Sequence, residues 1–160
     1  MTTATLDWRT VTVGDAVTPL EVPVTATLIV AGAIASRDYM PVHHDPAFAK
    51  RQGSPNIFMN ILSTNGLCVR FLTEWAGPEA MVKNLAIRLG TPSFPDDPLV
   101  FTGAVTSVAP GEDGEGLVGV AFSAKTSIGE HVSGTAVVSL LDDRTGGSAG
   151  RSAATRESGL

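Results

Sequence analysis

The pattern of apolar and polar residues changes near the middle of the chain, from helical spacing to strand-like alternation. In residues 56–77, "NIFMNILSTNGLCVRFLTEWAG", apolar side chains cover most of the helix circumference, which predicts one long buried helix. After residue 80, four segments have the alternating pattern of strands: 81–90, 98–110, 115–127 and 130–141. A long apolar helix beside an antiparallel sheet predicts an α+β fold in which the sheet wraps around the helix.

The first third of the chain predicts a short strand and a helix. Residues 20–24 read as an edge strand, where Pro23 is tolerated because an edge strand has free N–H positions. Thr27 is placed to cap a helix over the next eleven residues, "LIVAGAIASRD". Pro41 biases Met40 to an extended conformation, so this helix is expected to end before it.

A second, shorter helix is punctuated at both ends. In "DPAFAKRQG", Asp45 is the predicted N-cap, Pro46 occupies the first helical position, and Gly53 follows the end. We expect a single domain over residues 1–141. Residues 142–160 have almost no apolar content and predict a disordered tail.

Composition narrows the class of protein. The 160 residues are 43% hydrophobic and carry a formal net charge of −5, which disfavours nonspecific nucleic-acid binding because that requires a basic surface. Cys68 is the only cysteine, so no intrachain disulfide is expected. The N-terminus lacks a signal-peptide pattern, and no apolar run approaches the roughly 18 residues of a membrane span. We therefore expect a cytoplasmic protein that does not span a membrane.

Titratable residues concentrate in "RDYMPVHHDP", residues 37–46. His43, His44 and Asp45 are consecutive, so their side chains diverge and no metal site is predicted. Nucleophilic catalysis is also disfavoured, because no G-x-S-x-G motif is present and Cys68 lies in the middle of the long helix.

General acid–base chemistry is compatible with the same stretch. Asp38 and His43 are five residues apart on one loop that Pro41 stiffens. A carboxylate and an imidazole that converge on one water molecule can share its activation. The spacing is equally compatible with a structural arrangement, in which Asp38 caps a loop and His43 is a buried histidine with its hydrogen bonds satisfied.

The stretch "RDYMPVHHDPAFA" resembles the hydratase motif of MaoC-type (R)-specific enoyl-CoA hydratases, and the resemblance extends over about residues 20–141. It implies a hotdog fold and the syn addition of water across the 2,3-double bond of a 2-enoyl-CoA. It also implies that Asp38 and His43 hold the catalytic water and move its protons, while His44 only packs or bonds within the loop. No cofactor is implied, because coenzyme A is part of the substrate.

Two positions depart from the family motif. Met40 stands where the motif has asparagine, and "FMNIL" places Asn60 and Ile61 where the family usually has His-Gly. In the family, the glycine N–H binds the thioester oxygen at the helix N-terminus. The resemblance therefore assigns the backbone N–H of Ile61 to this oxyanion role and Asn60 to substrate binding. The larger side chain of Ile61 is expected to reshape the acyl pocket.

Other stretches, such as "QGSPNIFMNILSTNGL" and "FLTEWAGPEA", resemble the small MaoC-type subunit of actinobacterial steroid side-chain enoyl-CoA hydratases. This implies a bulky substrate and a second MaoC-like subunit in a heterodimer or heterotetramer, although a homodimer fits too. A small sheet with an open edge also predicts a partner. Two alternatives remain: an acyl-CoA thioesterase, disfavoured because the first acidic residue of the long helix is Glu74, and a catalytically silent subunit, disfavoured because Asp38 and His43 are both present.

Overall fold

The computed structural model describes residues 4–141, and the predicted tail over residues 142–160 lies outside the described residues. Three short 3-10 turns, Trp8–Thr10, Pro41–His43 and Glu112–Gly114, accompany the main elements. The helices and strands follow the order β1 Ala16–Val22, α1 Ala26–Ala35, α2 Pro46–Arg51, α3 Ile61–Ala76, β2 Met81–Leu89, β3 Leu99–Pro110, β4 Gly116–Thr126 and β5 Gly129–Leu140.

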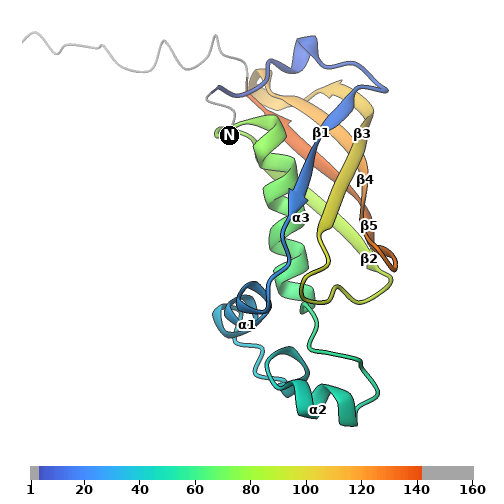
Figure 1. Cartoon of the computed structure of the whole chain (residues 1–160). Coiled ribbons are helices and arrows are strands. Elements are labelled where there is room, and N and C mark those ends of the chain that lie inside the picture. The colour runs from blue at the N-terminus through green and yellow to red at the C-terminus, as the bar shows by residue number, and fades with distance from the viewer. Residues whose placement is uncertain (1–3, 142–160) are drawn as a thin grey trace, which may run out of the picture.

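The five strands form one antiparallel sheet in the order β1-β3-β4-β5-β2. Figure 1 shows α3 lying along one face of this sheet, with α1 and α2 beyond the N-terminal end of α3. The four strands expected after residue 80 are all present, and the predicted α+β arrangement of a sheet around a long helix is confirmed. β1 and β2 are the two edges of the sheet.

The core lies between α3 and the concave side of the sheet. Phe71, near the middle of α3, stacks on Phe101 of β3 with ring centroids 5.4 Å apart and lies 6.0 Å from Phe122 of β4. The opposite side of α3 is exposed at Leu62 and Val69. The helix is therefore buried on one face only within this chain, rather than around its whole circumference.

The predicted boundaries of the first strand and helix were wrong by several residues. β1 runs from Ala16 to Val22, so the proline inside this edge strand is Pro19 and not Pro23. Thr25, and not Thr27, caps α1, because its hydroxyl accepts a hydrogen bond from the Leu28 N–H at 3.0 Å. Thr25 and Thr27 are equivalent cap candidates in the sequence. Because β1 ends at Val22 and α1 begins at Ala26, Thr25 is the one that lies at the cap position.

The long helix begins at Ile61, five residues later than predicted. The Asn60 side chain caps it, and the Met59 N–H donates to the Ser93 carbonyl at 3.0 Å. This bond holds the residues before Asn60 in an extended path against the β2–β3 loop. At the other end, Gly77 follows the last helical residue, with a φ of 105° that favours glycine, and this is where the predicted range of 56–77 also ends.

The second helix begins as its sequence predicted. The Asp45 carboxylate accepts hydrogen bonds from the Ala47 and Phe48 N–H groups at 2.8 and 3.0 Å, and Pro46 is the first helical residue. Asp45 is thus occupied as a helix cap. Within residues 4–141, no helix is long and apolar enough to cross a membrane.

Candidate active site

The end of α1 places Asp38. The Arg37 N–H donates to the Ile34 carbonyl at 3.0 Å, and the Asp38 N–H donates to the Ala33 carbonyl at 2.9 Å. This pair of bonds is the Schellman arrangement, in which the chain leaves a helix through one left-handed residue. Arg37 is that residue, with a φ of 58°. The carboxylate of Asp38 is therefore attached to a backbone turn fixed by two hydrogen bonds.

His43 lies in the 3-10 turn Pro41–His43 and is 7% exposed. Its Nδ1 lies 2.7 Å from the Phe58 carbonyl oxygen, which can only accept, so the Nδ1–H donates. In the neutral ring Nε2 is then an acceptor, and it lies 3.3 Å from Oδ2 of Asp38. At this distance a protonated Nε2 donates directly to Oδ2, whereas a neutral ring leaves two acceptors that one donor, such as a water molecule lying to the side of the pair, can bind together.

Asn60 connects this pair to the N-terminus of α3. Its Oδ1 accepts the Ser63 N–H at 3.0 Å, so its Nδ2 must be the atom that donates to Ser36 Oγ at 2.9 Å and to Asp38 Oδ2 at 3.0 Å. The amide orientation is thus fixed by its partners. Asn60 is 2% exposed, and a direct contact between it and a substrate stays a prediction.

The environment of Asp38 favours its ionised form. The hydrogen bond from Asn60 is the main cause that lowers the pKa of Asp38 below its ordinary value, and the Met40 N–H and the nearby His43 add to it. Partial burial acts in the opposite direction. At neutral pH the residue is therefore a carboxylate, which is the form that can accept a proton.

The backbone N–H of Ile61 is available beside the pair. Ile61 is the first residue of α3, and no other described residue accepts a hydrogen bond from its N–H. The positive end of the helix dipole adds to the field at this position. Asn60 bonds to Asp38 and directly precedes Ile61, so this N–H belongs to the residue that follows a partner of the acid–base pair.

The remaining candidates lie elsewhere. His44 is exposed, and its backbone N–H donates to the Pro41 carbonyl at 3.1 Å. Burial raises the pKa of the Cys68 thiol to about 12, which removes it as a nucleophile. Glu74 bonds Arg70 at 2.7 Å, one turn from the C-terminal end of α3. Among residues 4–141, no three His, Cys, Asp or Glu side chains gather in a way that could hold a metal.

Two supporting groups were not foreseen. Ser36 accepts the second hydrogen bond of Asn60 while donating its own hydroxyl to the Gly32 carbonyl at 2.7 Å. The Phe58 carbonyl sets the tautomer of His43, and the Phe58 ring meets the imidazole edge-on with centroids 5.0 Å apart. A backbone carbonyl leaves no signal in a sequence, and Ser36 differs from other serines only through its tertiary neighbours.

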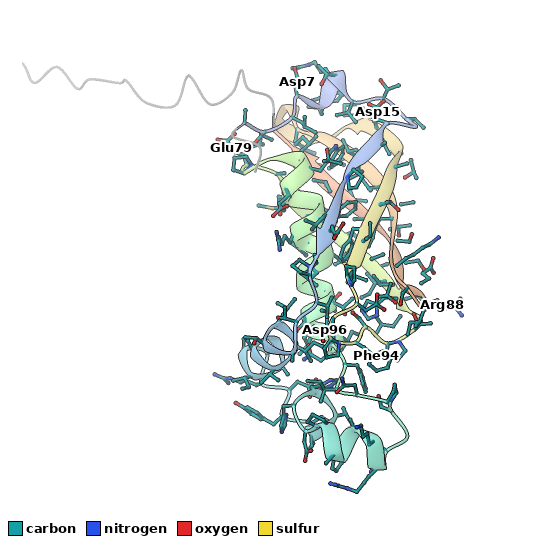
Figure 2. The ribbon with its side chains drawn as sticks, in the orientation of Figure 1. Asp7, Asp15, Glu79, Arg88, Phe94 and Asp96 are labelled. Carbon is teal, nitrogen blue, oxygen red and sulfur yellow. The ribbon has the colours of Figure 1, made fainter. Side chains whose placement is uncertain are left out.

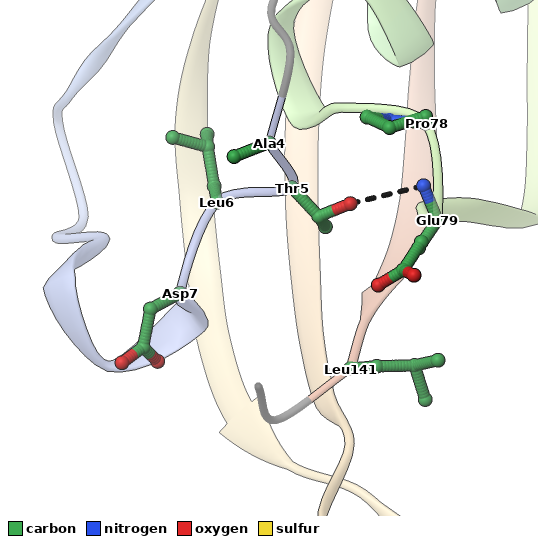
Figure 3. Close-up of a pocket in the computed structure, with 7 residues that line it drawn as sticks. All are labelled: Ala4, Thr5, Leu6, Asp7, Pro78, Glu79 and Leu141. Atoms are coloured by element: carbon green, nitrogen blue, oxygen red, sulfur yellow. Dashed lines mark hydrogen bonds between the residues drawn. The ribbon is translucent and has the colours of Figure 1, made fainter. Parts of the chain in front are cut away.

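Two hollows lie away from these residues. One of about 260 Å³ is at the C-terminal end of α3, where the Glu79 N–H donates to Thr5 Oγ1 (Figure 3). The other, of about 470 Å³, is lined by Arg88, Thr91, Glu130 and neighbouring residues. Figure 2 shows Arg88 and Phe94 at the end of the sheet nearest α1, and Glu79 at the opposite end. Only the second hollow shares the end of the molecule that holds Asp38.

The fold and the paired Asp and His place the chain among hotdog proteins of the MaoC type. Residues 9–126 match the MaoC-like domain family, and the chain belongs to that family. It is 42% identical over 116 residues to the 3-oxo-4,17-pregnadiene-20-carboxyl-CoA hydratase beta subunit of Mycobacterium tuberculosis, covering 72% of this chain and 86% of that one.

Solved structures agree. The crystal structure of the ChsH1–ChsH2 complex from Mycobacterium tuberculosis is similar with a TM-score of 0.75 and 40% identity, covering 81% of this chain and 98% of that one. The (R)-hydratase from A. caviae involved in PHA biosynthesis has a TM-score of 0.70 and 25% identity, covering 81% and 97%. The hotdog fold predicted from the motif is confirmed.

Proposed function

We propose that this protein is an enoyl-CoA hydratase that adds water across the 2,3-double bond of a 2-enoyl-CoA thioester. One observation carries the proposal: Nε2 of His43 and Oδ2 of Asp38 lie 3.3 Å apart, and Asn60, which bonds Asp38, directly precedes the N–H of Ile61. With His43 in its neutral form, Nε2 and Oδ2 can both accept hydrogen bonds from one water molecule, and the Ile61 N–H can bind the thioester oxygen.

The chemistry follows from this geometry. The Ile61 N–H stabilises the enolate-like oxygen that forms when water attacks C3, and one such donor contributes on the order of 3–4 kcal/mol. Asp38 and His43 orient the water, take one proton from it, and return a proton to C2, so that the substrate gains one water in total. No further cofactor is needed, because coenzyme A enters with the substrate.

The substrate is proposed to be a bulky apolar acyl-CoA, of the steroid side-chain type named for the Mycobacterium tuberculosis relative. Exposed apolar side chains follow Asp38 and Asn60 directly in the sequence and support the proposal. Tyr39 and Met40 follow Asp38, and Ile61 and Leu62 follow Asn60, with exposed fractions of 48 to 66%. Such a group of exposed apolar residues is typical of a surface that binds an apolar ligand.

The active assembly is proposed to contain a second MaoC-like subunit. The structure of the 40% identical relative is that of a complex, and the curated relative is named a beta subunit. In this chain Val69 on α3, and Met81 and Leu89 on the edge strand β2, expose large apolar side chains. An open strand edge beside an apolar helix face is suited to pairing with another sheet.

The test is a hydration assay that follows the loss of enoyl-thioester absorbance. The chain, alone and co-expressed with a MaoC-like partner, is given a short linear enoyl-CoA and a steroid-derived one. His43→Asn keeps a donor for the Phe58 carbonyl but removes the Nε2 acceptor, and Asp38→Asn keeps the shape of the carboxyl. Each is expected to lower kcat by roughly 100-fold or more.

His44→Asn is the matched control, because it changes an exposed neighbouring histidine in the same way, and it is expected to keep wild-type activity. Hydration that survives in both His43→Asn and Asp38→Asn would refute the assigned roles. The absence of hydration of either substrate by the complex would refute the proposed function.

A further inference from the structure

A second histidine lies buried beneath the site. His131, on β5, is 3% exposed, and both of its ring nitrogens have partners. Nδ1 lies 2.7 Å from the Thr91 carbonyl oxygen, so the Nδ1–H donates. Burial lowers the pKa of His131, which keeps the ring neutral near pH 7. Nε2 is therefore an acceptor, and it receives the Thr64 hydroxyl at 2.9 Å.

Thr64 connects this histidine to the first turn of α3. It is fully buried, and its N–H donates to the Asn60 carbonyl at 3.1 Å. Its hydroxyl also lies 3.2 Å from the same carbonyl. The Thr64 hydroxyl has one proton and two possible acceptors. Nε2 of His131 is the nearer of the two, and the Asn60 carbonyl already accepts the Thr64 N–H. The hydroxyl is thus the polar link between β5 and the turn that begins with Asn60.

That turn carries two parts of the site. Asn60 donates to Asp38 at 3.0 Å, and Ile61 supplies the free N–H. His131 joins three segments at this point: β5, the β2–β3 loop through Thr91, and α3 through Thr64. The chain of contacts from His131 through Thr64 and Asn60 to Asp38 is continuous.

We propose that His131 is a positioning residue for hydration: through Thr64 it holds the first turn of α3 where Asn60 orients Asp38 and where the Ile61 N–H meets the thioester oxygen. This inference rests on the proposed function. The ring is 3% exposed and its nitrogens bond Thr64 and Thr91 rather than Asp38 or His43, so the proposed effect is on geometry and not on proton transfer.

Two pairs of variants separate this role from simple core packing. His131→Asn places a donor near the position of Nδ1 and loses the acceptor for Thr64, whereas His131→Gln extends an amide oxygen toward the position of Nε2. Thr64→Val removes the hydroxyl at nearly constant shape, and Thr64→Ser keeps it. His131→Asn and Thr64→Val are expected to lower kcat roughly 10- to 100-fold with KM almost unchanged. His131→Gln and Thr64→Ser are expected to retain most of kcat.

The assays are run on the complex at a temperature well below the lowest melting temperature of the set. An NMR titration of the Asp38 carboxyl is run in parallel without substrate. It measures the pKa of Asp38, which the hydrogen bond from Asn60 lowers, so it reports whether that bond is intact. If Thr64→Val loosens the bond from Asn60, the Asp38 carboxyl titrates at higher pH than in the wild type, and Thr64→Ser restores it.

Variants that melt earlier but keep the wild-type kcat and the wild-type Asp38 titration would show that His131 is only a packing residue and would overturn the inference. A wild-type complex that hydrates no enoyl-CoA refutes the proposed function instead. In that case the Asp38 titration still decides whether His131 positions the carboxylate. A Thr64→Val variant with an unchanged titration refutes positioning under either result.

Discussion

Replacing Asn60 by Asp tests how the carboxylate of Asp38 is controlled. The change keeps the size of the side chain and keeps an oxygen that can accept the Ser63 N–H. Aspartate caps a helix about as well as asparagine, so α3 is expected to stay formed. What the variant loses is the donor that lies 3.0 Å from Oδ2 of Asp38. A second carboxylate takes the place of that donor.

The expected loss can be worked from this contact. A hydrogen bond to a charged group contributes about 1.5–3 kcal/mol, and Asp38 is partly shielded, with its side chain 27% exposed. If the bond holds Asp38 in its reactive orientation, kcat/KM is expected to fall roughly 10- to 100-fold. The pKa of Asp38 is expected to rise, because the largest cause of its lowering is removed and a like charge is added.

The assay is the pH profile of kcat/KM for enoyl-CoA hydration, beside a thermal melt. Asp38 works as a carboxylate, so activity is lost as pH falls through its pKa, and the acid limb of the variant is expected at higher pH. Asn60→Ala is the comparison, because it also removes the cap and is expected to cost about 1 kcal/mol of stability. An Asn60→Asp enzyme with the wild-type rate and acid limb would refute the reasoning.

Three further predictions concern stability. Phe71→Ala removes a ring stacked on Phe101 in the core and is expected to lower the free energy of unfolding by about 3–5 kcal/mol in a denaturant melt, with a smaller loss for Phe71→Leu. Arg37→Gly relieves a left-handed residue at φ 58° and is expected to raise stability by up to about 1 kcal/mol, whereas Arg37→Ala gives no such gain. His131 has a lowered pKa in the folded state, so below about pH 6.5 the unfolded state binds the extra proton and stability falls as pH drops toward the folded pKa. Melts of His131→Gln are expected to show a flatter dependence over that range, and an unchanged slope would contradict the assignment.

Much of the fold follows from local patterns. The four strands after residue 80 alternate in the sequence and form β2 to β5, and the residues around Asp45 and Gly77 mark helix ends that the structure confirms. Boundaries that depend on neighbours were less accurate. The start of α3 shifted because the Met59 N–H bonds the β2–β3 loop, which lies more than 30 residues later in the chain.

The sequence by itself determined which groups are available for chemistry. Asp38 and His43 are close along the chain and joined by a stiff loop, so their encounter is a local property that the motif already expresses. Ile61 was assigned through the family resemblance alone, and the structure makes it the first residue of α3, whose N–H has no partner within that helix.

Only the tertiary structure decided how those groups are held. Asn60 reaches Asp38 across 22 positions, and Thr64 reaches His131 across 67. Such contacts depend on how α1, α3 and β5 pack, because hydrogen bonds between distant residues form only after the core has brought their backbones together. The Nδ1–H of each buried histidine is also set by a carbonyl of another segment, Phe58 for His43 and Thr91 for His131. The sequence shows only that a histidine is present, whereas packing determines which of its two ring nitrogens can accept a proton.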